Sequence, residues 1–587
     1  MNTANTITAC LLAAAASCSA LAAEPAKRIW PSPFGIGGDH HTSQTPEKWI
    51  PQMAAISIKV NRSLHMNWDA VEPREGQWDW AACDRQLQCM IDNGVETGGI
   101  FLANPVWTRK ENPGKGSVTL PSDNLPAWSN YVSVAVKRYK GKIRVWEVWN
   151  EPPNFTGSRQ DATDYAKVVA AAYDAAKAAD PDCLVGLGVK SVHLNYLERA
   201  IKAGAKDKFD YVTVHPYEVK GGVSRDEGTE AIFMNIVPSI RKMLARVNPA
   251  KADAPVVFSE LGTNAALPSE HRAGLGPVVA AQVLVKSYAM GIAQGVDCIQ
   301  WFEGMDGDSG AMGLLDAVGK PRPSYTAMGQ TIKHLGSRPS SLGWVLLNGK
   351  HYAFVFQGAK GPVLITWAYK GIADEVDFGR DVPIVDPLTG QTSVASKYHL
   401  TTAPIIVGNV PDSLVAQAKS NKARPLPWGG DYSNAKSVSI TFGEKTVEKG
   451  LHTQASDAVA KDVLAYGGSC RSGDVPGGNI FMIDPNFLLA GEPGPVRISV
   501  VVRRNEANDV AGFKLSYESA NARDGYATAP DWYSVPDNKQ WHTATWDIDD
   551  AQFVNMWGYS FALNSDGNKY NKYVIQSVTV EKLPAAK

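Results

Sequence analysis

Residues 145–155 have the sequence VWEVWNEPPNF, and this stretch is the most informative in the chain for the fold. Its first half is a short run rich in valine and tryptophan, which predicts a buried strand. The strand has to stop at Pro152 and Pro153, because proline has no N–H to donate to a neighbouring strand. Asn150 and Glu151 are therefore expected at the carboxyl end of the strand, where a polar side chain can meet solvent or a ligand.

Seven similar segments accompany this one and alternate with helical stretches, such as the alanine-rich residues 161–180. Eight strands and their helices, the last helix near 324–335, predict an α/β fold with a (β/α)8 TIM barrel over residues 33–335. A doubly wound open sheet is the alternative, but it usually has fewer strands, and no GxGxxG motif follows the first strand. The eight β-like segments are 34–41, 56–66, 95–107, 143–152, 183–189, 209–217, 255–264 and 297–304.

Polar and aromatic residues gather at the carboxyl ends of these strands. Active sites of TIM barrels lie on that rim, so the pattern predicts a functional site there. The residues at or just past a strand end are His40, His65, Trp107, Glu151, Tyr217, Glu260 and Trp301.

The alternation of strand-like and helical segments ends after residue 335. Residues 336–412 contain short strand-like runs with Gly, Pro and Asp turns, which predict a small β domain. Residues 413–431 are typical of a linker, and residues 432–587 contain alternating strands at sandwich spacing. We interpret this last segment as a jelly-roll-like β-sandwich that either binds carbohydrate or supports the barrel.

Composition limits the classes of partner. The chain has 587 residues and a net charge of −1, which gives no electrostatic reason to expect nucleic acid or an anionic membrane. No segment after the N-terminus is long and apolar enough to be a predicted transmembrane helix. Seventeen Trp and twenty Tyr fit either a carbohydrate partner, whose C–H faces stack on aromatic rings, or large β cores. The oligomeric state is not indicated.

The N-terminus predicts export. Residues 1–23 contain an apolar run followed by a small-x-small site near Ala22, which is typical of a signal peptide, although no Lys or Arg precedes the run. We therefore expect a secreted or periplasmic protein; the sequence around Cys18 only weakly resembles a lipoprotein site. No CxxC or Cys/His cluster suggests zinc, and the remaining cysteines are predicted to be free thiols: Cys83, Cys89, Cys183, Cys298 and Cys470.

Glu151 and Glu260 are the candidate catalytic pair, because each ends a predicted strand of the same barrel, the fourth and the seventh. Hydrolysis of a glycosidic bond with retention needs two carboxyl groups about 5–5.5 Å apart, one to protonate the leaving oxygen and one to attack the anomeric carbon. Glu303 is the alternative to Glu260 as the attacking group. The segment Asp306–Asp308 lacks the further acidic ligands of a calcium loop and is interpreted as a turn.

These residues also carry a family resemblance. Asn150-Glu151-Pro152 at the end of strand four and Ser259-Glu260 at the end of strand seven resemble the clan A glycoside hydrolases. Within the clan, VWEVWNEPPNF and the HPY sequence at 215–217 are most similar to family 39, which includes β-xylosidases, α-L-iduronidases and exopolysaccharide-cleaving enzymes. The resemblance covers the barrel and the adjoining β domain.

The resemblance implies roles for individual residues. Glu151 would be the acid/base, Glu260 the nucleophile, and Asn150 the partner of the sugar 2-hydroxyl. We expect Glu260 to be ionised, and repulsion from it to keep the proton on Glu151. The other substrate-binding candidates are His215 and Tyr217 beside the nucleophile, Arg62 as its cation or as a separate salt bridge, Trp301 and Trp107 as sugar platforms, and His65 as a pocket or loop residue.

The sequence thus predicts an exported retaining glycosidase that acts on an oligo- or polysaccharide by double displacement. No cofactor and no metal are expected. A non-catalytic glycan-binding protein is the alternative from another class, and a transglycosylase is the alternative among enzymes. The two glutamates specify neither the sugar nor whether cleavage is exo or endo.

Overall fold

The computed structural model describes residues 28–584 with several gaps, so the predicted signal peptide lies outside the described residues. The side chains of His40, His41, Ser63 and His65 are also outside the description. The gaps are residue 39, 110–118, 154–159, 455–469, 476, 489–490, 506–509, 539 and 568.

Eight parallel strands form a closed barrel in the order β1 to β8, which confirms the predicted fold class. Each strand lies within or largely within its predicted segment. β8 closes the barrel against β1, with Phe34 opposite Ile299 and Gly37 opposite Phe302. The strands are β1 Phe34–Gly37, β2 Val60–Asn67, β3 Glu96–Leu102, β4 Val145–Val148, β5 Leu184–Lys190, β6 Tyr211–His215, β7 Val256–Leu261 and β8 Cys298–Phe302.

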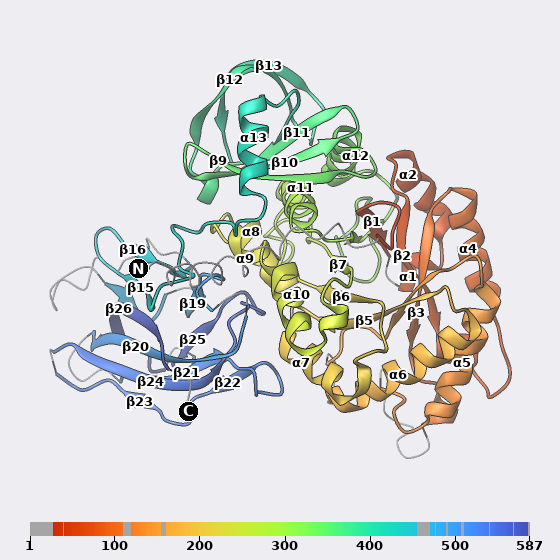
Figure 1. The fold of residues 1–587 in the computed structure, drawn as a ribbon, viewed down its shortest axis with the longest axis horizontal. Coiled ribbons are helices and arrows are strands. Elements are labelled where there is room, and N and C mark those ends of the chain that lie inside the picture. Colours follow the sequence, from red (N-terminus) through yellow and green to blue (C-terminus); the bar gives the residue numbers. More distant parts are fainter. Residues whose placement is uncertain are drawn as a thin grey trace, which may run out of the picture.

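Helices surround the barrel on its outer side (Figure 1). The predicted alanine-rich helix is α6, whose N-cap residue Asp161 accepts a hydrogen bond from the Thr163 amide. The helices of this part of the chain are α1 His40–Ser43, α2 Ile50–Ala55, α3 Trp68–Val71, α4 Ala81–Asp92, α5 Leu125–Tyr139, α6 Ala162–Ala179, α7 Leu194–Ala200, α8 Tyr217–Ser224, α9 Glu230–Phe233, α10 Ile236–Val247, α11 Pro277–Ala293 and α12 Pro323–Leu335.

Aromatic packing between strands and helices fixes the start of the opening stretch. Trp146 in β4 is fully buried and its ring stacks on that of Phe101 at 4.8 Å. A Cβ atom at Gly99 in β3 would lie 2.4 Å from the Trp146 ring, so only glycine fits there. The prediction that Trp146 is a packing residue is confirmed.

The second unit is one antiparallel sheet in the order β13-β12-β14-β11-β10-β9, and β9 and β10 pack against α11 and α12. Helix α13, Asp412–Asn421, begins where the sequence predicts a linker. It lies close to β9, because a Cβ at Gly343 would meet the Ala418 carbonyl. The strands are β9 Ser340–Leu347, β10 His351–Gly358, β11 Gly361–Thr366, β12 Asp374–Val385, β13 Thr392–Leu400 and β14 Ile405–Val407.

The C-terminal unit is a sandwich of two antiparallel sheets. One has the order β16-β15-β26-β20-β24 with β18 paired to β26, and the other the order β17-β19-β25-β21-β22 with β23 paired to β21. The strands are β15 Ser437–Thr441, β16 Val447–Lys449, β17 Leu451–Thr453, β18 Arg471–Ser472, β19 Asn479–Ile483, β20 Gly494–Arg504, β21 Gly512–Glu518, β22 Tyr526–Thr528, β23 Tyr533–Ser534, β24 His542–Ala551, β25 Phe561–Asn564 and β26 Tyr573–Lys582.

Buried polar contacts join the three units. The Trp367 indole of the β domain donates to Glu230 of the barrel at 2.9 Å. Trp428, between the β domain and the sandwich, is buried and stacks on His452 with ring centroids 3.6 Å apart. The sandwich packs beside α7 (Figure 1), where the Asn195 amide donates to the Ser519 carbonyl at 2.9 Å. The sandwich is therefore attached to the flank of the barrel.

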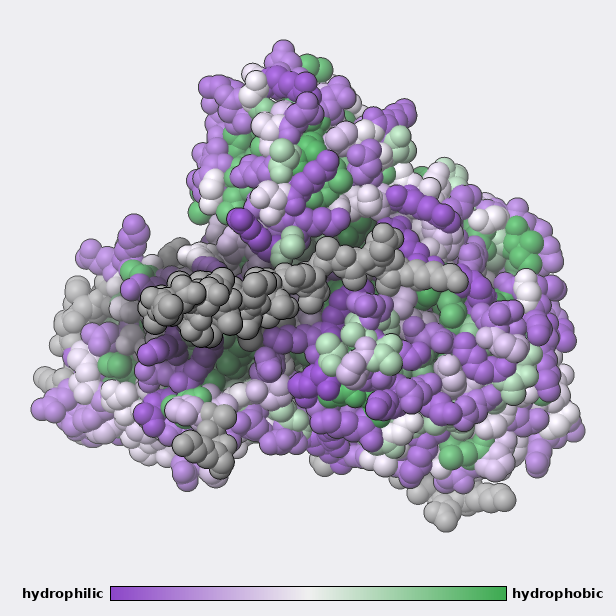
Figure 2. Space-filling view, in the orientation of Figure 1, coloured by the Kyte–Doolittle hydropathy of each residue, from purple (hydrophilic) through white to green (hydrophobic). Residues whose placement is uncertain are grey.

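The outer surface agrees with the balanced composition. The face in Figure 2 is mostly hydrophilic, with hydrophobic residues in small scattered groups. Among the residues that the structure describes, no helix combines the length and the apolar character needed to cross a bilayer. As predicted, no disulfide joins any two of the five described cysteines, all of which are buried: Cys83, Cys89, Cys183, Cys298 and Cys470.

Candidate active site

The backbone turns sharply where β4 ends and exposes the polar pair predicted there. Strand β4 stops at Val148, and the Trp149 amide donates to the Phe101 carbonyl at 2.9 Å. Trp149 and Glu151 have φ of 67° and 49°, a left-handed conformation that costs a non-glycine residue about 1–3 kcal/mol. Trp149 is fully buried, which anchors the turn, while Asn150 and Glu151 remain partly exposed at the mouth of the barrel.

The structure brings Glu151 and Glu260 together around His215, the last residue of β6. The Nδ1 atom of His215 lies 2.8 Å from Oε1 of Glu151 and 3.5 Å from Oε2 of Glu260. One oxygen of each carboxylate and a His215 ring nitrogen all lie within 4.8 Å of one another. This spacing is shorter than the roughly 6.5–9.5 Å at which inverting glycosidases hold their carboxyl groups to admit a water.

Arg62 of β2 is the cation of the site. Its guanidinium forms an ion pair with Glu260 and donates to Oδ1 of Asn150 at 2.7 Å. The same group contacts Oε2 of Glu147 at 3.3 Å. Of the two interpretations of Arg62, the structure supports the cation beside Glu260. Because Arg62 holds the carbonyl side of Asn150, the amide NH₂ is the group available to donate to a sugar hydroxyl.

Glu147 is a site residue that the sequence analysis missed. It is 5% exposed and accepts hydrogen bonds from Thr213 at 3.0 Å and Ser259 at 3.1 Å. Burial alone would raise its pKa, but Arg62 and His215 hold that pKa below its usual range. Strand alternation was the available signal, since an outward Trp146 places Glu147 inside the barrel.

The protonation pattern differs from the expected one. A hydrogen bond of 2.8 Å joins Nδ1 of His215 to Oε1 of Glu151. Burial would lower the pKa of His215, but Glu260 and Glu151 raise it overall. Burial would raise the pKa of Glu151, but the hydrogen bond and charge of His215 lower it. These shifts favour the proton on His215 and not on Glu151, because an adjacent cation outweighs the repulsion from Glu260.

Tyr217 completes the surroundings of Glu260. Its hydroxyl donates to Oε2 of Glu260 at 3.3 Å. Burial and the charge of Glu260 raise the pKa of Tyr217 well above its usual value, so it stays a hydrogen-bond donor. His215 and Tyr217 thus lie beside Glu260, as the resemblance implies.

Trp301 is not a sugar platform, contrary to the prediction. It is 1% exposed and its ring packs against Tyr288 of α11, with centroids 6.4 Å apart. Side chains alternate along a strand, so a position one residue away would face the barrel interior. Glu303, the alternative nucleophile, is fully buried and accepts a hydrogen bond from the Gly307 amide. Such a carboxylate is closed off from a substrate.

Trp107 and His65 remain predictions as sugar-binding residues. Trp107 is half-buried after β3, its indole donates to the Glu72 carbonyl at 2.9 Å, and its ring packs edge-on against Trp68. The side chain of His65 lies outside the described residues, as do those of His40 and His41.

Glu151, His215 and Glu260 are also close enough to hold a metal ion. Their ligand atoms are oxygen and nitrogen, which suit several divalent cations. The guanidinium of Arg62 already neutralises Glu260, and a second cation would meet its repulsion. Charge and hydrogen bonding therefore account for the cluster without a metal.

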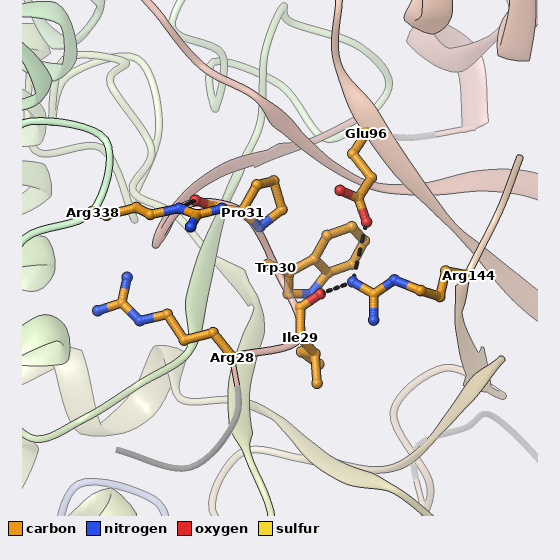
Figure 3. Close-up of a pocket in the computed structure, with 7 residues that line it drawn as sticks. All are labelled: Arg28, Ile29, Trp30, Pro31, Glu96, Arg144 and Arg338. Atoms are coloured by element: carbon orange, nitrogen blue, oxygen red, sulfur yellow. Dashed lines mark hydrogen bonds and ion pairs between the residues drawn. The ribbon is translucent and has the colours of Figure 1, made fainter. Parts of the chain in front are cut away.

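A separate pocket of about 370 Å³ lies at the opposite end of the barrel (Figure 3). Glu96 begins β3 and Arg144 precedes β4, so this pocket faces away from Glu151. Arg144 contacts Glu96 at 3.4 Å, and Arg338 donates to the Pro31 carbonyl at 2.9 Å. These arginines attach the segment before β1 to the barrel. The lining residues are Arg28, Ile29, Trp30, Pro31, Glu96, Arg144 and Arg338.

Comparisons with known proteins agree with this site. The sequence model of glycosyl hydrolase family 10 matches residues 45–188, which include β4 and Glu151. The endo-1,4-beta-xylanase A of Phanerodontia chrysosporium is 29% identical over 191 residues, or 29% of this chain and 45% of that protein. The endo-1,4-beta-xylanase 1 of Gibberella zeae is 23% identical over 287 residues, or 46% of this chain and 78% of that protein.

This chain spans less than half the length of the Phanerodontia xylanases it matches, 45% of xylanase A and 39% of xylanase C. A solved family 39 glycoside hydrolase from Bacteroides cellulosilyticus WH2 has a similar fold, with a TM-score of 0.54 and 17% identity. That likeness covers 64% of this chain and 81% of the other. Together these findings confirm the resemblance to clan A glycoside hydrolases, with the sequence match falling in family 10 and the fold match in family 39.

Proposed function

We propose that this protein is a retaining glycoside hydrolase that cleaves O-glycosidic bonds of an oligo- or polysaccharide. The observation that carries the proposal is the pair Glu151 and Glu260, whose nearest oxygens lie within 4.8 Å at the carboxyl end of a TIM barrel. The family 10 match and the xylanase relatives support it. We further propose that the protein is exported, on the strength of the apolar N-terminal run.

In the first step Glu260 attacks the anomeric carbon, and the bond to the leaving oxygen breaks. Glu151 protonates that oxygen, and a covalent glycosyl-enzyme forms on Glu260. In the second step Glu151 takes a proton from water, the water oxygen bonds to the anomeric carbon, and Glu260 leaves as a carboxylate. Asn150 donates to the 2-hydroxyl, a bond that strengthens in the transition state.

His215 supplies a physical link between the two glutamates. The charge of Glu260 contributes most to raising the pKa of His215, and this charge disappears when Glu260 becomes an ester. The pKa of His215 then falls, and its proton passes over the 2.8 Å contact to Glu151, which needs it for the leaving oxygen. When Glu260 is released, its charge returns and His215 takes the proton back. Attack and proton donation are thereby coupled.

Xylan is the first substrate to test, because the curated relatives are named as endo-1,4-beta-xylanases. A panel of xylans, other polysaccharides and aryl glycosides, with product sizes recorded, would identify the sugar and separate exo from endo cleavage. Binding to a glycan without release of reducing sugar over the panel would favour the glycan-binding alternative and contradict the proposal.

Two variants test the assigned roles. Glu260→Gln should lower turnover roughly 10⁴-fold or more on every substrate, as loss of an enzymic nucleophile does. Glu151→Ala should lose activity on substrates with poor leaving groups but retain it on dinitrophenyl glycosides, and added azide should restore turnover by replacing the water. Glu303→Gln is the matched control, expected to leave the chemistry intact. Equal and unrescued losses at Glu151 and Glu260 would contradict these roles.

A further inference from the structure

A loop of the C-terminal sandwich lies on the rim of the barrel, between the ends of β5 and β6. The Ser191 hydroxyl, directly after β5, donates to the Met556 carbonyl. Two residues further along the loop, a Cβ at Gly558 would lie 3.2 Å from the Glu218 carbonyl oxygen, directly after Tyr217. The segment 556–558 therefore contacts the chain just after β5 and just after β6, and β5 is the neighbour of β4, which carries Glu151 at its end.

Trp557, at the centre of this segment, is partly exposed and lies next to Lys190. The ammonium group of Lys190, the last residue of β5, lies over the Trp557 ring at 5.8 Å from its centroid. The Lys190 amide donates to the Pro152 carbonyl at 3.1 Å, and the charge of Lys190 acts on the Glu151 carboxylate. Lys190 thus links Trp557 to the Glu151-Pro152 segment that carries the acid/base.

The sandwich holds this loop in a fixed conformation. The carboxyl group of Glu518, which is 1% exposed, accepts hydrogen bonds from the amides of Val554 and Asn555, both at 2.8 Å, and from that of Met556. Three consecutive amides bound to one buried group leave the loop little freedom. The loop that carries Trp557 is therefore already ordered at the rim, so binding of a ligand there costs little conformational entropy.

The side of the active site on which Glu151 lies is the side that receives the leaving sugar. The acid/base protonates the bridging oxygen, so the sugar that leaves must extend past Glu151. The water or acceptor that later attacks the glycosyl-enzyme enters from the same side. A residue beside Glu151 therefore contacts the leaving sugar or the incoming acceptor, and not the sugar bound to Glu260.

We propose that the C-terminal sandwich is part of the active site, with Trp557 and Lys190 forming the binding subsite for the leaving saccharide. This inference rests on the proposed function. The flat indole offers a surface for the C–H face of a pyranose ring, and the ammonium group donates to its hydroxyls or pairs with an acidic substituent. Trp557 is a positioning residue, since it touches the leaving sugar and not the reacting atoms.

The test measures how the glycosyl-enzyme divides between water and an added saccharide acceptor. A dinitrophenyl glycoside forms the intermediate without acid assistance, so the ratio of transfer product to hydrolysis product reports acceptor binding alone. Trp557→Ala should lower this ratio roughly tenfold, the factor that loss of a modest contact produces, and Trp557→Phe should restore most of it. Because this ratio is set after the dinitrophenyl group has left, it does not depend on how fast the glycosyl-enzyme forms in either variant.

Trp532→Ala is the matched control. Trp532 is a 36% exposed tryptophan of the same sandwich that directly precedes β23 and packs edge-on against Tyr570. It should leave the ratio unchanged. An unchanged ratio in Trp557→Ala, or an equal fall in both variants, would overturn the subsite. Absence of any glycoside turnover by the parent protein would instead overturn the proposed function.

Discussion

Two buried glutamates, one in the barrel and one in the sandwich, are satisfied by opposite means. Glu147 is surrounded by Arg62 and His215, and these cations hold its pKa low. Glu518 has no cation among its described partners and accepts backbone amides instead. Burial raises its pKa to about 8, although the amide hydrogen bonds oppose the shift.

Ionic charge is needed where several carboxylates lie close together, whereas hydrogen bonding suffices to hold a loop. The barrel site must keep several carboxylates close together, so it needs Arg62 as a permanent positive charge. The sandwich loop only has to be held in place, and a carboxyl group can do this in either protonation state. The barrel is therefore expected to be sensitive to loss of its cation, and the sandwich to pH.

Removing the cation of the barrel should have the largest effect. Arg62→Met leaves Glu147 and Glu260 without their principal counter-ion, which should lower kcat/KM by about 10³-fold and the free energy of unfolding by about 3–5 kcal/mol. Arg62→Lys should rescue little, because one ammonium cannot reach Glu260, Glu147 and Asn150 together. Steady-state kinetics and thermal unfolding of the full chain would measure both.

Arg497→Met is the matched control for this prediction. Arg497 pairs with Asp547 on the surface of the sandwich, where the two side chains are 43% and 50% exposed. Exposed ion pairs contribute little to stability, because water already solvates both charges. Similar losses of stability in both arginine variants would show that the buried network of the barrel has no special electrostatic role.

The sequence predicted the barrel and most of its rim because both depend on local signals. Apolar runs, helix periodicity and the stop at Pro152 can each be recognised within a few residues, and the register of a closed barrel then brings Glu151 and Glu260 together. Trp301 was placed wrongly because a shift of one residue along a strand exchanges its two faces. The position of a strand end could not be predicted that finely.

The remaining features depend on contacts between distant parts of the chain. The pairing of Glu147 with Arg62 is a tertiary contact, and the opposite protonation of Glu151 follows from where His215 lies. Trp557 was one of four sandwich tryptophans with no local feature to separate them. Only the packing of the sandwich against α7 and the end of β5 distinguishes it.

The pH dependence of kcat/KM tests the role of His215 as the carrier of the catalytic proton. Its pKa is raised above the usual 6.5, because Glu260 and Glu151 favour the charged imidazole, so the pair His215–Glu151 keeps its proton to a higher pH than a free histidine would and loses it as the pH rises through that pKa. For a substrate with a poor leaving group, kcat/KM should fall about tenfold per pH unit above that pKa. A dinitrophenyl glycoside, which needs no proton, should lack this basic limb.

His215→Asn provides the comparison within the protein. The proton would then titrate from the Glu151 carboxyl, whose pKa is lower than that of a histidine, so the basic limb should move to lower pH. Thr213, which binds Glu147 and not Glu151, offers Thr213→Val as a control that should leave the limb in place. A basic limb of equal position for both leaving groups would contradict the assignment of the proton.

The smallest effect concerns Glu518 and the stability of the sandwich. Its folded-state pKa of about 8 exceeds the unfolded value of about 4.3, so the folded state binds more protons between these limits. The stabilising contribution is complete below pH 4.3 and is lost as the pH rises to 8, in total a few kcal/mol at about 1.4 kcal/mol per pKa unit. In Glu518→Gln this decline should be absent.

Calorimetric unfolding of the full chain at pH 5 and pH 8 would measure the decline. The control is Glu492→Gln, which changes an exposed sandwich glutamate paired with Lys242. Parallel declines in the parent and in Glu518→Gln would show that the carboxyl of Glu518 is not the titrating group, and that the loop bearing Trp557 is held independently of its charge.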